Sequence, residues 1–105
     1  MATRTPNTHG PQAGTSSFAD LVASDGTNVH EIRCITIVNT GASARTAYVS
    51  IGSGAAATEI IEIPVAAHST EIRNGYWAVP TSTVVQVKQD TGTDLTFTVS
   101  GQHYA

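Results

Sequence analysis

The stretch that decides the fold is Glu31–Gly52, which reads EIRCITIVNTGASARTAYVSIG. Its two halves flank a small-residue segment, Thr40–Ala44, and each half carries apolar side chains at alternate positions. In the second half, one face is formed by Ala47, Val49 and Ile51. Alternation with a period of two is typical of strands and not of helices. The stretch therefore predicts two strands joined by a turn, and we expect them to pair as a β-hairpin.

The first of these two strands is apolar on both faces. The pattern places Ile32, Cys34 and Val38 on one face and Ile35 and Ile37 on the other. Strands that are apolar on both faces belong to the interior of a sheet. We therefore expect this segment to be a central strand.

Similar short runs recur along the rest of the chain, between turn signals such as Asp25-Gly26 and Asn74-Gly75. No segment of ten or more residues shows a helical stripe, and we expect seven or eight strands. The pattern predicts one antiparallel β-sandwich, jelly-roll-like or immunoglobulin-like. The further expected strands are Phe18–Val22, Glu59–Val65 with Pro64 at an edge or strand end, Thr70–Arg73, Ser82–Asp90 with Val85 and Val87 inward, and Leu95–Tyr104 with Leu95, Phe97 and Val99 inward.

The first seventeen residues differ from the rest because they are almost entirely polar. Such a segment buries too little apolar surface to offset the entropy lost when it becomes ordered. We expect an extended N-terminal arm over residues 1–17, without internal backbone partners, followed by a sandwich domain over residues 18–105. We predict that neighbouring protein subunits hold the arm through Thr3, Thr5, Pro6, Asn7, Thr8, Pro11 and Gln12.

Composition limits the classes of partner. Only 12% of the 105 residues are charged, against about 25% in ordinary domains, and the net charge is -3. The five cations are not clustered, so a nucleic-acid partner is not expected. No apolar stretch is long enough to span a bilayer and no leader peptide is recognisable, so we expect no membrane partner either. An uncharged polar surface is easier to bury against other proteins.

The sequence offers little that suggests catalysis. The four histidines, His9, His30, His68 and His103, lack the spacing of a metal site and are interpreted as loop and terminal residues. The single cysteine, Cys34, lies in an apolar strand, where a thiol behaves as a small hydrophobe. Glu59 and Glu62 would point to opposite faces of a strand. We expect no enzyme activity, no cofactor and no metal.

The sequence resembles small β-sandwich virion proteins of tailed double-stranded-DNA bacteriophages. The resemblance covers about residues 18 to 102 and rests on Val38–Gly41, Arg45-Thr46, Ala66–Thr70 and Val99–Gly101. It implies a non-enzymatic structural role in a virion assembled from proteins made in the host cytoplasm. With the polar arm, it implies a capsid decoration or cement protein in many copies or as a homo-oligomer, bound to the major capsid protein or other virion subunits.

Two alternatives stay open. The same sandwich could serve as a tail, baseplate or head–tail connector component. The aromatic pair Tyr76-Trp77 could instead stack on a sugar, as in carbohydrate-binding modules. We expect Trp77 to be mostly buried, which favours the structural role.

Overall fold

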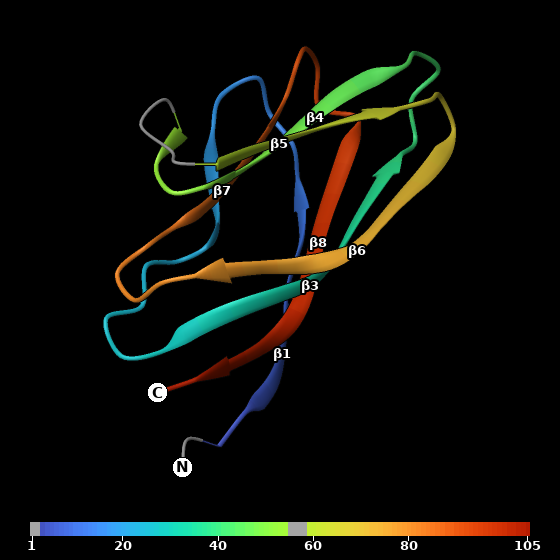
Figure 1. Cartoon of the computed structure of the whole chain (residues 1–105). Coiled ribbons are helices and arrows are strands. Elements are labelled where there is room, and N and C mark those ends of the chain that lie inside the picture. The colour runs from blue at the N-terminus through green and yellow to red at the C-terminus, as the bar shows by residue number, and fades with distance from the viewer. Residues whose placement is uncertain (1–2, 55–58) are drawn as a thin grey trace.

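The computed structural model describes residues 3–54 and 59–105, apart from the side chain of Glu59. Its strands form two four-stranded antiparallel sheets, which confirms the predicted all-β sandwich (Figure 1). Sheet A has the strand order β1-β8-β3-β6, and sheet B has the order β2-β7-β4-β5. The strands are β1 (Thr5–Ala13), β2 (Ala19–Val22), β3 (Val29–Asn39), β4 (Arg45–Ile51), β5 (Glu59–Val65), β6 (Ser69–Val79), β7 (Val85–Gln89) and β8 (Leu95–Tyr104).

The core lies between the two sheets and consists of apolar residues of β2 to β8, mostly at alternate positions. The inward faces predicted for β4, β7 and β8 are confirmed, and Phe97 is fully buried at the centre. Pro64 lies in the edge strand β5, where a missing N–H is tolerated. The buried apolar side chains are Leu21, Val22, Ile32, Ile35, Ile37, Ala47, Val49, Ile51, Ile63, Val65, Val79, Val85, Val87, Leu95, Phe97 and Val99.

Strand β3 is central, as expected, but the predicted grouping of its side chains is wrong at one residue. A β-bulge between Ile32 and Cys34 shifts the register with both neighbouring strands. The extra residue brings Ile32 into the core with Ile35, while Cys34 lies on the outer face. Gly101 allows this close approach, because a Cβ there would lie 1.8 Å from the carbonyl oxygen of Glu31.

The predicted hairpin between β3 and β4 is also wrong, because the two strands belong to different sheets. Asn39, the last residue of β3, is buried, and its side chain bonds to backbone groups beyond the strand. Its Nδ2 donates to the Ser43 carbonyl at 2.9 Å and to the Ala66 carbonyl at 3.2 Å, and its Oδ1 accepts from Gly41 N at 2.9 Å. These bonds join the β3–β4 connection to the β5–β6 turn.

Asn74-Gly75 does not form a turn. Both residues lie within β6, which runs unbroken to Val79. The register of β6 against β3 shifts at this point, so the extra residues form a bulge beside the bulge in β3. Side chains after the bulge alternate, and Trp77 packs partly buried against the core while Tyr76 lies exposed on the outer face.

The N-terminal segment is not a free arm. Residues Thr5–Ala13 form β1, which pairs with β8 at the edge of sheet A. Pairing continues beyond the strand, because Gly14 N donates to the Leu95 carbonyl and the Thr15 carbonyl accepts from Gln89 N, both at 2.8 Å. The expectation of backbone groups without internal partners is therefore wrong. As an edge strand, β1 needs few apolar side chains. Strand β8 supplies hydrogen-bond partners for one row of its backbone groups, and the other row can bond to water.

Candidate functional site

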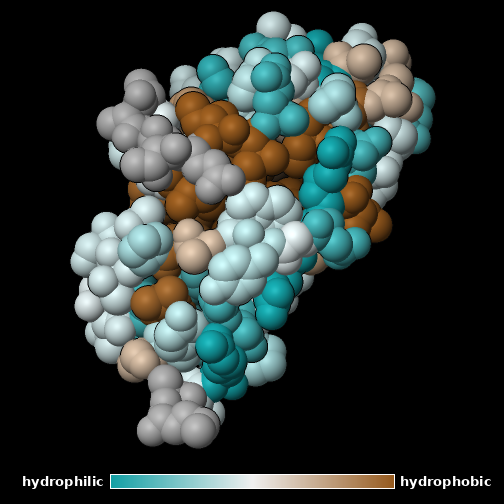
Figure 2. Space-filling model, viewed as in Figure 1, coloured by the Kyte–Doolittle hydropathy of each residue, from teal (hydrophilic) through white to brown (hydrophobic). Residues whose placement is uncertain are grey.

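Sheet A extends beyond sheet B at one end, where β1 begins and β8 ends (Figure 1). The molecule is elongated as a result, with extents of 48 × 25 × 17 Å. We call this region the open end and define it as Thr5–His9, Val29–Glu31 and Gly101–Tyr104. On the face shown in Figure 2, apolar side chains gather over the sandwich, whereas the open end is mostly hydrophilic or neutral.

Three histidines from three strands meet at the open end around one asparagine. Asn7 Nδ2 lies 3.1 Å from His9 Nε2, 3.2 Å from His30 Nδ1 and 3.1 Å from His103 Nδ1. The ring centroids are 5.6 Å apart for His9 and His30, and 5.5 Å apart for His30 and His103. We call these four residues the histidine cluster. The β1–β8 and β3–β8 registers bring them together on the face that continues the core.

A carboxylate holds the far side of the cluster. Asp25 Oδ2 lies 3.1 Å from His30 Nε2, and the same carboxylate accepts from Thr27 N at 2.9 Å and Asn28 N at 3.1 Å. These backbone bonds, with one from the Asn28 amide, lower the pKa of Asp25. The predicted Asp25-Gly26 turn is thus present and positions a negative charge beside His30.

The surroundings favour the neutral form of one ring. Burial lowers the pKa of His9 from 6.5, and the charges that His30 and His103 can acquire lower it further. Only His9 of the three lies on β1, which ties this strand to the ionisation state of the cluster.

The opposite face of the open end carries a second polar cluster around Glu31. This carboxylate is 4% exposed and accepts from Arg4 Nη1, from the Tyr76 hydroxyl and, at 2.6 Å, from Gln102 Nε2. Its donors come from the segment before β1, from β6 and from β8. We call Arg4, Glu31, Tyr76 and Gln102 the Glu31 cluster. It links β3, β6, β8 and the segment before β1 through one charge.

Ionisation of Glu31 stabilises this cluster. The hydrogen bond from Tyr76 lowers the pKa of Glu31 and outweighs the opposing effect of burial, and Gln102 and Arg4 add to the lowering. The same hydrogen bond raises the pKa of Tyr76. Hydrogen bonds to a charged acceptor are stronger than those between neutral groups, so the carboxylate is held in its anionic form.

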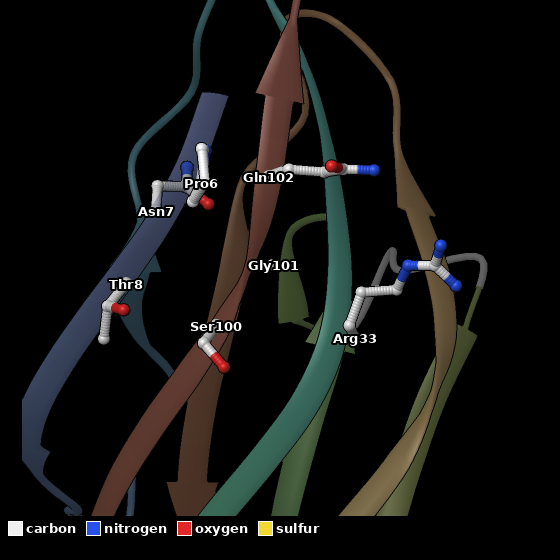
Figure 3. A pocket seen from close by; sticks show the side chains of 7 residues that line it. All are labelled: Pro6, Asn7, Thr8, Arg33, Ser100, Gly101 and Gln102. Atoms are coloured by element: carbon white, nitrogen blue, oxygen red, sulfur yellow. The ribbon is translucent and has the colours of Figure 1, made fainter. Parts of the chain in front are cut away.

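A shallow depression of about 550 Å³ lies on the same outer face. Its lining includes Thr8, Arg33, Ser100 and Gln102, and Figure 3 shows that these side chains point in different directions. Arg33 lies 4.9 Å from the centre of the Tyr76 ring and covers one face of it. The depression does not offer the converging polar groups that orient a small ligand.

The residues predicted to bind a partner now have positions on β1 or next to it. Thr5, Pro6 and Thr8 are exposed in the half of the strand within the open end, whereas Asn7 turns inward to the histidine cluster. Thr3 and Pro11 are also exposed, and Gln12 is half-buried beyond the bulge. Tyr76 and Trp77 lie on opposite faces of β6 and do not form one aromatic platform.

Sequence reasoning missed both clusters. The sequence predicts separate loop and terminal histidines, yet His9, His30 and His103 all lie in strands. The one usable signal is that His30 shares the phase of the apolar Ile32. Nothing in the local sequence indicates which strands pair, and pairing is what brings the rings together.

Over the part of the chain that the structure describes, no group of three or more His, Cys, Asp or Glu side chains has a geometry that could hold a metal ion. Cys34 has a free thiol 3.7 Å from the Thr36 hydroxyl. In residues 3–54 and 59–105, no helix has the length and apolarity needed to cross a membrane.

Comparison with known proteins gives little. No protein-family model matches the chain, and no curated protein matches it. One solved structure that it resembles comes from work entitled "Bacillus endospore appendages form a novel family of disulfide-linked pili". The identity is 13%, the TM-score is 0.46, and the alignment covers 99% of this chain and 83% of that one. A likeness of this degree carries no argument about function.

Proposed function

We propose that this chain is a non-enzymatic structural subunit of a virion, with capsid decoration as the specific role, and that β1 is its exchangeable docking strand. In the isolated chain β1 pairs with β8. In the particle, the half of β1 within the open end leaves β8 and pairs with the edge of a neighbouring subunit. Strand addition of this kind supplies backbone hydrogen bonds without demanding a large apolar interface.

The observation that carries this proposal is the weak side-chain attachment of that half of β1. Thr5, Pro6 and Thr8 are exposed and bury no apolar group, and only Asn7 and His9 turn inward, into a polar cluster. A strand held by a ladder and a few polar contacts opens at a lower free energy than one anchored in a core.

The strand composition also suits exchange. From Thr5 to Ala13, β1 carries no Asp, Glu, Lys or Arg, so little charge must be desolvated when it docks. Pro6 restricts the backbone of the released segment and reduces the entropy lost on docking. Binding of β1 together with the sandwich surface of the same copy would add avidity.

The resemblance to phage virion proteins supports a particle as the partner, and the decoration role over a tail role rests on the polar N-terminal segment. The sugar-binding alternative has less support. Its two aromatic residues lie on opposite faces, the Tyr76 hydroxyl is bound to Glu31, and Arg33 covers one face of the Tyr76 ring.

The test is a reversible covalent lock between β1 and β8. Thr8 and Ser100 are direct cross-strand partners, so Thr8→Cys with Ser100→Cys, in a Cys34→Ser background, can form a disulfide that holds β1 in place. The matched control is Val38→Cys with Thr70→Cys in the same background, which locks β3 to β6. Particles assembled with the unmodified protein are stripped of it. Each variant is then added back, and its bound copies are counted.

We expect the oxidised β1–β8 lock to bind at least tenfold fewer copies than its reduced form, and the control to bind equally in both forms. Equal binding by the oxidised and reduced β1–β8 variants would show that β1 does not exchange. Absence of the chain from purified particles, measured by mass spectrometry, would overturn the virion role itself.

A further inference from the structure

We infer that the histidine cluster is a pH-sensitive latch, which holds the half of β1 within the open end on β8 near neutral pH and releases it on mild acidification. The inference concerns the regulation of the strand named above, and its use in a particle rests on the proposed function. The release itself is a property of the isolated chain and is tested there.

The contacts to Asn7 favour unprotonated ring nitrogens. Asn7 Nδ2 carries two protons and can donate to two of the facing nitrogens of His9, His30 and His103 at a time, and each of these nitrogens accepts only while it carries no proton. Imidazolium has N–H groups on both nitrogens, so protonation places N–H against N–H. Two neighbouring rings that are both charged also repel each other, because their centroids are within 5.6 Å.

Among the neighbouring groups, a negative charge that could offset protonation lies beside one ring of the cluster. From the β2–β3 loop, Asp25 faces His30 and can stabilise its charged form. From β6, the neighbour of His30 is Val79, which is apolar and buried. On the other face, Arg4 pairs with Glu31 and lies 4.4 Å from the centre of the Tyr104 ring, and neither contact involves a histidine. Near His9 and His103, the described residues provide no carboxylate contact.

The direction of the pH effect follows from His9. A histidine whose pKa is lowered in the folded state binds fewer protons folded than unfolded. Its contribution to stability is therefore complete above pH 6.5, the ordinary pKa of a histidine in the unfolded chain, and is lost as pH falls below that value. Glu31 stays ionised in this range because its pKa is lowered from 4.5, so the second cluster does not titrate with the first.

Local hydrogen exchange provides the test. Amide protection is measured on the purified full chain at about pH 7.5 and about pH 5.5, and is corrected for the intrinsic exchange rate at each pH. Each proton taken up on opening raises the opening equilibrium up to tenfold per pH unit. We expect protection of the Thr5–His9 amides, and of their partners on β8, to fall about tenfold or more, while amides of β4 and β7 keep theirs.

Two variants separate the latch from general acid sensitivity. His9→Gln keeps an acceptor for Asn7 but cannot acquire a charge, so most of the pH effect should disappear. The matched control is His68→Asn, which removes an exposed histidine at a left-handed turn position that asparagine tolerates. It should behave as the unmodified chain.

Unchanged protection of β1 at the two pH values, or an equal loss of protection in both sheets, would overturn the latch. A full pH effect in His9→Gln would overturn the assignment to His9. Neither outcome bears on the strand exchange tested with the disulfide lock, so failure of the latch and failure of the proposed function are distinguishable.

Discussion

The two halves of sheet A are fastened in different ways. Where sheet B covers it, the sheet buries apolar side chains, and Phe97, Ile35 and Ile37 are all 0% exposed. At the open end, the strands are joined on one face by the histidine cluster and on the other by the Glu31 cluster. Burial of apolar side chains does not depend on pH, whereas the strength of the polar contacts changes when their ionisable groups gain or lose a proton.

The difference shows which part of the chain can move without unfolding the rest. Burial in the sandwich is shared among residues of both sheets, so losing one strand there would expose the core. The open end can lose the pairing of Thr5–His9 and expose mainly polar groups. The segment from Gln12 to Thr15 stays fixed by the buried Gly14 and by bonds to both sheets.

The largest effect is expected in the sandwich half. Phe97→Ala should lower the free energy of unfolding by about 3 to 5 kcal/mol, because the cavity forms at a fully buried site. Urea denaturation measures the loss. A decrease below about 1 kcal/mol would mean that the contribution of Phe97 to the core is wrongly assigned.

A second substitution tests the boundary between the halves. Gly101→Ala should destabilise the protein by about 1 to 3 kcal/mol, since its Cβ would lie 1.8 Å from the Glu31 carbonyl and force the paired bulges apart. Gly26→Ala is the matched control, because the nearest atom to its Cβ would be 3.9 Å away. Equal denaturation midpoints for the two variants would contradict this account.

The Glu31 cluster should make stability depend on pH in a more acidic range than the histidine cluster does. Because the pKa of Glu31 is lowered on folding, its contribution is present above pH 4.5 and is lost as pH falls below that value. Glu31→Gln should therefore be less stable at neutral pH and approach the unmodified chain in acid, measured as melting temperature against pH. Glu62→Gln, on the edge strand β5, serves as control, and a constant difference at all pH values would exclude the mechanism.

The smallest effect concerns Trp77, which is half-buried at the limit of the core. Iodide should quench its fluorescence less than that of free tryptophan, and equally at about pH 7.5 and about pH 5.5, because the latch releases β1 and not β6. Quenching as efficient as for free tryptophan would place the ring in solvent and return support to the sugar-binding alternative.

The sandwich could be predicted because its information is local. Alternation in β4, β7 and β8 identified the buried faces correctly, and Pro64 identified an edge. The errors occurred where pairing partners or bulges override the local pattern. Ile32 changes face because of one extra residue, Asn74-Gly75 forms a bulge instead of a turn, and β3 and β4 part into different sheets.

By itself, the sequence determined that the chain is all β, which residues of most strands face inward, and that charged residues are few. These properties depend on the alternation of apolar residues and on composition, both of which can be read from residues close together in the sequence. Only the tertiary structure decided that the polar N-terminal segment is a strand on β8, and that His9, His30 and His103 meet at Asn7. Strand order and register determine such meetings, and they are fixed by the packing of two whole sheets.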